Sequence, residues 1–360
     1  MDSFLQSKFV EVGKLLLDQE NAEVLVEPRR HEDGFWFGGG NICEGQNGDL
    51  WLVGRYRNGG DSRTGVEAGP RGAELLLMHS EDGGRNFEPA FSWKKQDLAP
   101  AGDKVLSIEG AALSRKGEGV ELYVSSEKDR VYPETVRGAQ KGGTGVWSID
   151  VLRAGSMNEL AHAPVEPVLG SDNPVWLHVK DPVIFQDGGR RILIYCSHPY
   201  CWSSSNTGYA VEVPGNDHWD NASWCLKSRG PCWDVAAFRI TDRLALPPVG
   251  VLESGRFSMY FYDGAECIHD HGGDPPTGYS CEEVGGLVVG HDEEFPHLER
   301  ISVKRPLFLS PYGRGTSRYV SVFDAGDRYI ATWQQSRPDL SQPLVVNEVP
   351  RESVEKVLQS

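Results

Sequence analysis

Four acidic residues and one arginine stand at places in the sequence where their side chains can meet. Glu109, Asp181 and Arg318 each lie near the start of an apolar strand, in segments of similar layout, and Asp263 and Glu266 follow another such strand. Carboxylates that share a pocket repel one another, so the pKa of at least one of them should rise. A protonated carboxylic acid beside an ionised carboxylate is what cleavage of a glycosidic bond requires. One group protonates the leaving oxygen, and the other activates water or attacks the carbon.

A purely structural interpretation exists for part of this set. An unpaired charge beside a narrow channel is costly because it loses its water. Arg318 could therefore bridge to one carboxylate and tie two parts of the fold together. One arginine does not easily account for Glu109 and Asp181 together with Asp263 and Glu266.

The segments that carry these residues repeat about every 70 residues. Each has an apolar strand, a turn rich in Gly and Asp and a second apolar or aromatic strand, followed by a further strand–turn–strand half. The first halves are residues 38–57, 107–128, 178–199, 246–266 and 316–336. The second halves are residues 73–89, 145–164, 233–248, 285–302 and 343–358. Superimposing the turns aligns Gly40, Glu109, Asp181, Pro247 and Arg318.

Four strands repeated five times predict an all-β fold, a five-bladed β-propeller. A β-sandwich with coincidental spacing is the alternative, which five matched turns disfavour. Residues 3–19 have a helical apolar rhythm and predict a short N-terminal helix packed on the propeller. We expect a single domain over 1–360, with the helix and a strand extension in 1–30, the propeller in 31–350 and a terminal helix in 351–360. The turn at 80–87, SEDGGRNF, is interpreted as structural.

The loops after the second strand of each repeat open on the same face as the strand starts, and they are long and polar. Long loops on a rigid scaffold commonly carry function. Aromatic rings in or beside these loops could stack on sugars, and their basic and polar groups could donate to hydroxyls. The candidate substrate-binding residues are Arg318, Asn41, Arg57, His198, Tyr200, Trp202 and Trp333.

The composition excludes several classes of partner. With 36 Lys and Arg against 52 Asp and Glu, the net charge is −16, which disfavours nucleic acid and anionic membranes because phosphate binding depends on basic residues. No apolar run approaches the roughly 20 residues of a membrane helix. The 42 Gly and 22 Pro indicate many turns. We expect an oligosaccharide or small glycoside as partner and no nucleic acid or membrane, with a homo-oligomer left open.

The seven cysteines are an odd number, so at least one cannot pair within the chain. The N-terminal residues lack the features of a signal peptide. We therefore expect free thiols and a cytoplasmic location. No cofactor is expected. His269-Asp270-His271, with Cys267 and Cys281, superficially resembles a metal site, but its spacing is not typical of zinc sites, so no metal is predicted.

The order of several short motifs resembles that of the five-bladed glycoside hydrolases, nearest to family 130, with the related families 43, 32 and 117. The motifs are GGGNI, GDLWLVGRYR, SEDGGRNF, KDPVIF (180–185), SMYFYDGAE (258–266) and PLFLSP (306–311). The resemblance spans residues 34–350 and implies an enzyme of the kind found in that group. The group contains inverting mannoside phosphorylases and hydrolases, and furanosidases in the related families.

The chain departs from these families at three places. The Glu-Asp-Pro-Arg motif of family 130 is here 108–111, in which Glu109 is the one carboxylate. The aspartate base of families 43 and 32 is replaced by 39–41, Gly-Gly-Asn. The phosphorylases' Tyr-His-Gly is here 262–264, Tyr-Asp-Gly, followed by Glu266. A carboxylate there would repel phosphate, which favours hydrolysis.

The resulting hypothesis is an exo-acting, inverting glycoside hydrolase with catalytic residues among Glu109, Asp181, Glu266 and Asp263. A phosphorylase of the same fold is the first alternative. A non-catalytic carbohydrate-binding propeller is the second, and it predicts carboxylates paired off in salt bridges.

Overall fold

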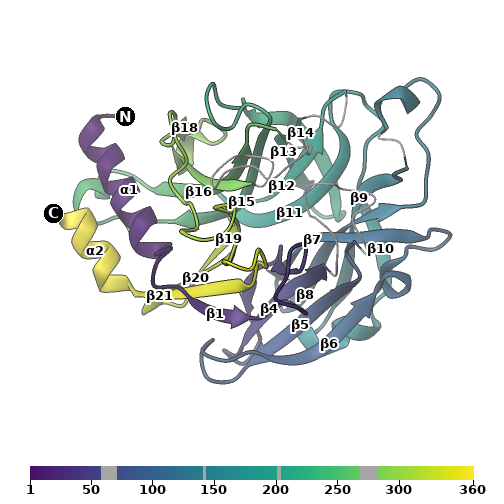
Figure 1. Ribbon diagram of the computed structural model, residues 1–360, viewed down its shortest axis with the longest axis horizontal. Coiled ribbons are helices and arrows are strands. Elements are labelled where there is room, and N and C mark those ends of the chain that lie inside the picture. Colours follow the sequence, from purple (N-terminus) through teal and green to yellow (C-terminus); the bar gives the residue numbers. More distant parts are fainter. Residues whose placement is uncertain (58–70, 141–142, 201–203, 268–282) are drawn as a thin grey trace.

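The computed structural model describes residues 1–57, 71–140, 143–200, 204–267 and 283–360. Within them the strands form five antiparallel sheets arranged as the blades of a propeller (Figure 1). The predicted all-β, five-bladed fold with an N-terminal helix is confirmed.

The blades follow one another along the chain, apart from the last. Blade one holds β2 (Trp36–Gly38), β3 (Ile42–Glu44), β4 (Leu50–Arg57), β5 (Glu74–Ser80) and β6 (Glu88–Lys94). Blade two holds β7 (Val105–Lys116), β8 (Gly119–Lys128), β9 (Val146–Ala154) and β10 (Val165–Leu169). Blade three holds β11 (Leu177–Asp187), β12 (Arg190–His198), β13 (Asn206–Val213) and β14 (His218–Lys227). Blade four holds β15 (Ala237–Ala245), β16 (Phe257–Ala265), β17 (Val284–His291) and β18 (Glu299–Arg300).

Blade five joins the two ends of the chain. It holds β19 (Ser317–Asp324), β20 (Arg328–Gln335), β21 (Leu344–Pro350) and, on the outside, β1 (Glu23–Val26). The N-terminal strand β1 pairs antiparallel with β21, with Glu23 opposite Val346. This pairing fixes the first segment of the chain to the last blade and closes the ring.

Two helices cover the outside of blades four and five. Helix α1 (Ser3–Leu16) begins where the side chain of Asp2 accepts a hydrogen bond from the N–H of Leu5. Its Phe9, Val12 and Leu16 are completely buried in one apolar cluster with strands of both blades. Helix α2 (Arg351–Gln359) lies beside α1 (Figure 1). Among the described residues, neither helix is long and apolar enough to cross a membrane.

The structure corrects which residues form blade four. Its innermost strand is β15 (Ala237–Ala245), which pairs with β16, and not the segment from residue 246 onward. Pro247 therefore lies beyond the end of this strand, and Arg239 stands near its start. The outer half of blade three is correspondingly β13 and β14, in place of residues 233–248.

The acidic turn at 80–87 has the structural role expected of it. One Asp82 oxygen accepts from the backbone N–H groups of Arg85 and Asn86, each at 3.0 Å. Gly83 and Gly84 have φ of 76° and 94°, values that few side chains tolerate. The described cysteines, Cys43, Cys196, Cys225, Cys232 and Cys267, are free thiols, whereas Cys201 and Cys281 lie outside the described residues.

Candidate active site at the centre of the propeller

Antiparallel pairing brings the start of each innermost strand beside the end of the second strand. In blade four this places Arg239 directly opposite Asp263, and in blade one it places Gly38 opposite Arg55. Glu109, Asp181 and Arg318 stand near the starts of β7, β11 and β19. The charged side chains singled out from the sequence therefore come from several blades to one end of the propeller axis.

Irregularities in the innermost strands set the directions of these side chains. The register of the innermost strands shifts between Ile108 and Ala111, between Lys180 and Val183, and between Arg318 and Ser321. Such bulges redirect side chains and are common next to active sites. Asp181 and Tyr319 lie within two of the shifts and have φ of 54° and 51°, which is unfavourable for a residue with a Cβ.

Arg239 connects three of the carboxylates. Its guanidinium is 3.2 Å from Asp181, 2.8 Å from Asp263 and 3.2 Å from Glu283. It is buried, and its negative neighbours hold its pKa well above the usual range although burial opposes the charge. Glu283 also pairs with Arg318. The expected bridge from Arg318 to a carboxylate thus exists, but its partner is Glu283.

The fourth carboxylate, Glu109, has a separate set of partners. Arg55 approaches it to 3.2 Å and the hydroxyl of Ser107 donates to it at 2.8 Å. Burial opposes its ionisation, but the positive charges of Arg55 and Lys180 outweigh burial and lower its pKa to about 2. Its side chain is still 15% exposed.

Asp263 and Glu283 differ in state although both bind Arg239. Asp263 is 0% exposed, and burial together with the charge of Glu283 raises its pKa to about 6 despite Arg239. Glu283 has a side chain that is 20% exposed, and Arg239 and Arg318 outweigh its burial and lower its pKa to about 2. The cluster thus holds one carboxyl with a pKa raised to about 6 beside carboxylates that are ionised at lower pH, as is expected when carboxylates share a site.

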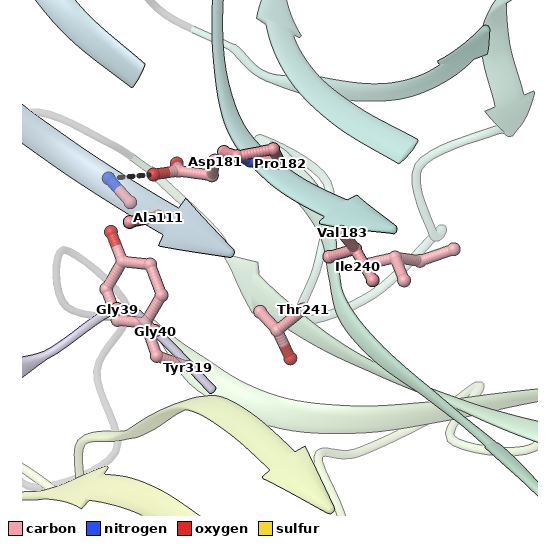
Figure 2. A pocket seen from close by; sticks show the side chains of 10 residues that line it. Gly39, Gly40, Ala111, Asp181, Pro182, Val183, Ile240, Thr241 and Tyr319 are labelled. Atoms are coloured by element: carbon pink, nitrogen blue, oxygen red, sulfur yellow. Dashed lines mark hydrogen bonds between the residues drawn. The ribbon is translucent and has the colours of Figure 1, made fainter. Parts of the chain in front are cut away.

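A small hollow of about 20 Å³ lies at the axis beside this cluster. Residues of all five innermost segments line it, among them Gly40, Ala111, Asp181, Thr241 and Tyr319 (Figure 2). An oxygen of Asp181 accepts from the N–H of Gly110 at 3.0 Å. Figure 2 shows the ring of Tyr319 directed toward Ala111 and Asp181. A group bound in the hollow would meet Asp181 and Tyr319 together.

Some of the residues predicted to bind substrate do reach this end of the propeller. Arg318 and Arg57 are buried at the start of β19 and the end of β4. His198 ends β12, where its Nδ1 bonds to the carbonyl of Ser204 at 2.8 Å and burial holds its pKa well below the usual value. Tyr200 is 63% exposed just beyond it. Trp202 lies outside the described residues.

Other predicted residues are placed differently. Trp333 is 0% exposed within the apolar cluster that also holds α1, so it has no surface for a sugar. The side chain of Asn41 accepts from the N–H of Leu113 at 2.7 Å and donates to its carbonyl at 3.0 Å, which joins blade one to blade two. Glu266 is exposed one residue beyond β16.

Sequence reasoning missed Arg239, Glu283 and Tyr319. Arg239 stands near the start of an innermost strand, as Arg318 does. It was missed because the sequence analysis began blade four at residue 246, beyond this strand. Glu283 directly precedes β17. It ends a polar segment that the sequence predicts to be a long loop, so its position could have marked it as a site residue. No sequence signal marks Tyr319. Within the described residues no cluster of three His, Cys, Asp or Glu is arranged to hold a metal ion, and 269–271 lies outside them.

Comparison with known proteins gives the fold without a sequence family. No protein-family model matches the chain, and no curated protein matches it in sequence. A solved structure described as a glycoside hydrolase is similar over 97% of this chain and 95% of that one, with a TM-score of 0.61 and 11% identity.

Two further solved structures show the same likeness. An α-L-arabinofuranosidase from Lactobacillus brevis is similar over 92% of this chain and 93% of that one, with a TM-score of 0.58 and 9% identity. A β-1,2-mannobiose phosphorylase from Listeria innocua, in complex with β-1,2-mannobiose, is similar over 93% and 97%, with a TM-score of 0.57 and 11% identity. The chain shares the five-bladed propeller fold of these structures.

Proposed function

We propose that the protein is a glycoside hydrolase that removes a terminal sugar from an oligosaccharide or glycoside with inversion. The observation that carries this proposal is the convergence of Glu109 and Asp181 from neighbouring blades at one end of the axis, beside a hollow. Cleavage of a glycosidic bond uses two carboxyl groups placed on either side of the sugar. The likeness in fold to the solved structures adds support.

The states of the carboxyls favour particular roles. Glu109 has a pKa of about 2 and is ionised at neutral pH, so it has no proton to donate and takes the base role of the pair. Asp181 lines the hollow and is the second carboxyl of the pair. Glu266, exposed one residue beyond β16, is the candidate third carboxyl. Asp263 is fully buried, so we now assign it to holding Arg239 and not to the reaction itself.

Action at a chain end is part of this proposal. Residues of all five blades line the hollow at the axis, among them Gly40, Ala111, Asp181, Thr241 and Tyr319. Its volume of about 20 Å³ has room for about one water molecule, so it fits the attacking water, and the products released from the substrate panel decide whether the sugar removed is terminal.

The charges favour water over phosphate as the attacking group. The four carboxylates Glu109, Asp181, Asp263 and Glu283 stand among four cations, which are Arg55, Lys180, Arg239 and Arg318. The three arginines already bind carboxylates, so phosphate would have to compete with them. A phosphorylase remains the second candidate because of the fold shared with the mannobiose phosphorylase.

The same salt bridges are also what a non-catalytic sugar-binding propeller would have, so the test must separate binding from turnover. The purified protein is incubated with a panel of oligosaccharides and aryl glycosides, with and without inorganic phosphate. We expect release of a free sugar at a rate independent of phosphate. A sugar phosphate formed only with phosphate would identify a phosphorylase, and calorimetric binding without any product would identify a binding module.

A further inference from the structure

Tyr319 contacts all three arginines that hold the carboxylates. The centre of its ring lies 4.4 Å from the guanidinium of Arg239, 5.3 Å from that of Arg55 and 5.6 Å from that of Arg318. Cations are attracted to the face of an aromatic ring at such distances. Arg55 binds Glu109, and the other two arginines bind the remaining carboxylates. A single ring therefore touches a partner of every carboxylate in the cluster.

The hydroxyl of Tyr319 adds a directed contact. It accepts a hydrogen bond from Nη2 of Arg55 at 3.2 Å, and the same Nη2 is 3.2 Å from Glu109. Nη1 of Arg55 is buried without a hydrogen-bond partner among the described residues. The tyrosine hydroxyl and Glu109 thus share Nη2 of Arg55, and the ring of Trp36, 4.6 Å from the same guanidinium, packs against it.

The backbone of Tyr319 is held in an unfavourable conformation. Its φ is 51°, and both oxygens of Asp263 accept from its N–H at 3.2 Å. Asp263 is itself fully buried and bound to Arg239. Strained backbone that is fixed by buried partners is concentrated at functional sites. A residue that only filled space would not need this conformation.

We propose that Tyr319 is a positioning residue of the active site, whose ring supports the three arginines and whose hydroxyl directs Arg55 onto Glu109. This role rests on the proposed function, because it serves the carboxylates assigned to glycoside cleavage. It also has a consequence that is independent of turnover, namely the charge state of Glu109.

Glu109 is surrounded by charges on several elements. They are Arg55 on β4, Arg71 before β5, Lys95 on the 3-10 helix Lys95–Leu98, Glu127 on β8 and Lys180 on β11. Tyr319→Phe changes none of these groups and removes only the hydroxyl. Loss of the hydroxyl loosens Arg55, which weakens the attraction that keeps Glu109 ionised. The pKa of Glu109 should therefore rise.

The test compares wild type with Tyr319→Phe and with the control Tyr312→Phe, which alters an exposed tyrosine near Arg337. The titration of the Glu109 carboxyl is followed by carbon-13 NMR of glutamate-labelled protein and assigned with Glu109→Gln. We expect the titration to move upward by about 1 pH unit in Tyr319→Phe, with thermal unfolding close to wild type and no change in the control.

Activity supplies the second measurement where the glycan panel yields a substrate. In Tyr319→Phe we expect kcat to fall about tenfold with KM nearly unchanged, and the acidic limb of the pH profile to shift upward by about the same interval as the NMR titration. An unchanged Glu109 titration in Tyr319→Phe overturns the positioning role. A wild type that cleaves no glycan defeats the proposed function, while the titration still decides the role of Tyr319.

Discussion

Arg239 on β15 and Asp181 on β11 form a buried ion pair, with 3.2 Å between Nη1 and Oδ2. The pair joins blade four to the neighbouring blade three near the axis of the propeller. The same guanidinium holds Asp263 and Glu283, so removing it would leave three carboxylates close together without their shared counter-charge. Arg239 therefore neutralises more of the negative charge of the cluster than a single ion pair would.

Arg239→Met is therefore expected to be strongly destabilising. Removing one partner of a buried ion pair typically costs about 3–5 kcal/mol, and we expect a loss of this size in the free energy of unfolding at pH 8, measured by urea denaturation. The control Arg85→Met alters an exposed arginine and should change stability by less than about 0.5 kcal/mol. Adding Asp263→Asn to Arg239→Met should recover part of the loss, because one uncompensated charge is removed. Equal stability of Arg239→Met and the control would show that the ion pairs contribute nothing.

The pH dependence of stability should carry a contribution from Asp263. Its pKa is raised from 3.8 to about 6 in the folded protein, so between these values the folded state binds more protons than the unfolded state. This contribution is complete below pH 3.8 and is lost as the pH rises through about 6. Relative to Asp263→Asn, wild type should lose up to about 3 kcal/mol between pH 4 and pH 7.

The difference between the two proteins isolates this group. Asp242 also has a pKa raised to about 6 by burial, but it is present in both proteins and cancels. Denaturant unfolding at several pH values gives the difference directly. Parallel stability curves for wild type and Asp263→Asn would mean that Asp263 titrates alike in the folded and unfolded chains.

Much of the fold could be predicted from the sequence because each blade repeats a strand–turn–strand pattern of apolar runs. Blade four was misframed because β15 alternates apolar residues with Arg239, Asp242 and Arg243, while the following 246–248, Leu-Pro-Pro, resembled the start of a repeat. The positions of Glu109 and Asp181 followed from the repeat alone. The Arg239 contacts and the turn of Tyr319 into the cluster arise from convergence in space and a positive φ, which have no local sequence signature. Trp333 shows the same limit, since a core tryptophan and a sugar-stacking tryptophan look alike in sequence.

Asn41→Ala should weaken the fold without weakening substrate binding. Its side chain makes two hydrogen bonds to the backbone of Leu113, and loss of such bonds typically costs about 1–3 kcal/mol. Urea denaturation should show this loss, and KM should stay at the wild-type value. The exposed Asn47→Ala is the matched control. A raised KM with unchanged stability would instead return Asn41 to the substrate-binding residues.

The central claim is that Glu109 and Asp181 carry out the cleavage of a glycosidic bond, and the most direct measurement is the kcat of Glu109→Gln and Asp181→Asn. Both are assayed on the glycoside that wild type cleaves best, with the exposed Glu118→Gln as control. Because a positioned acid or base contributes about 10²–10⁴-fold, we predict that each variant loses at least about 100-fold in kcat while the control matches wild type. Wild-type turnover by either variant would contradict the account.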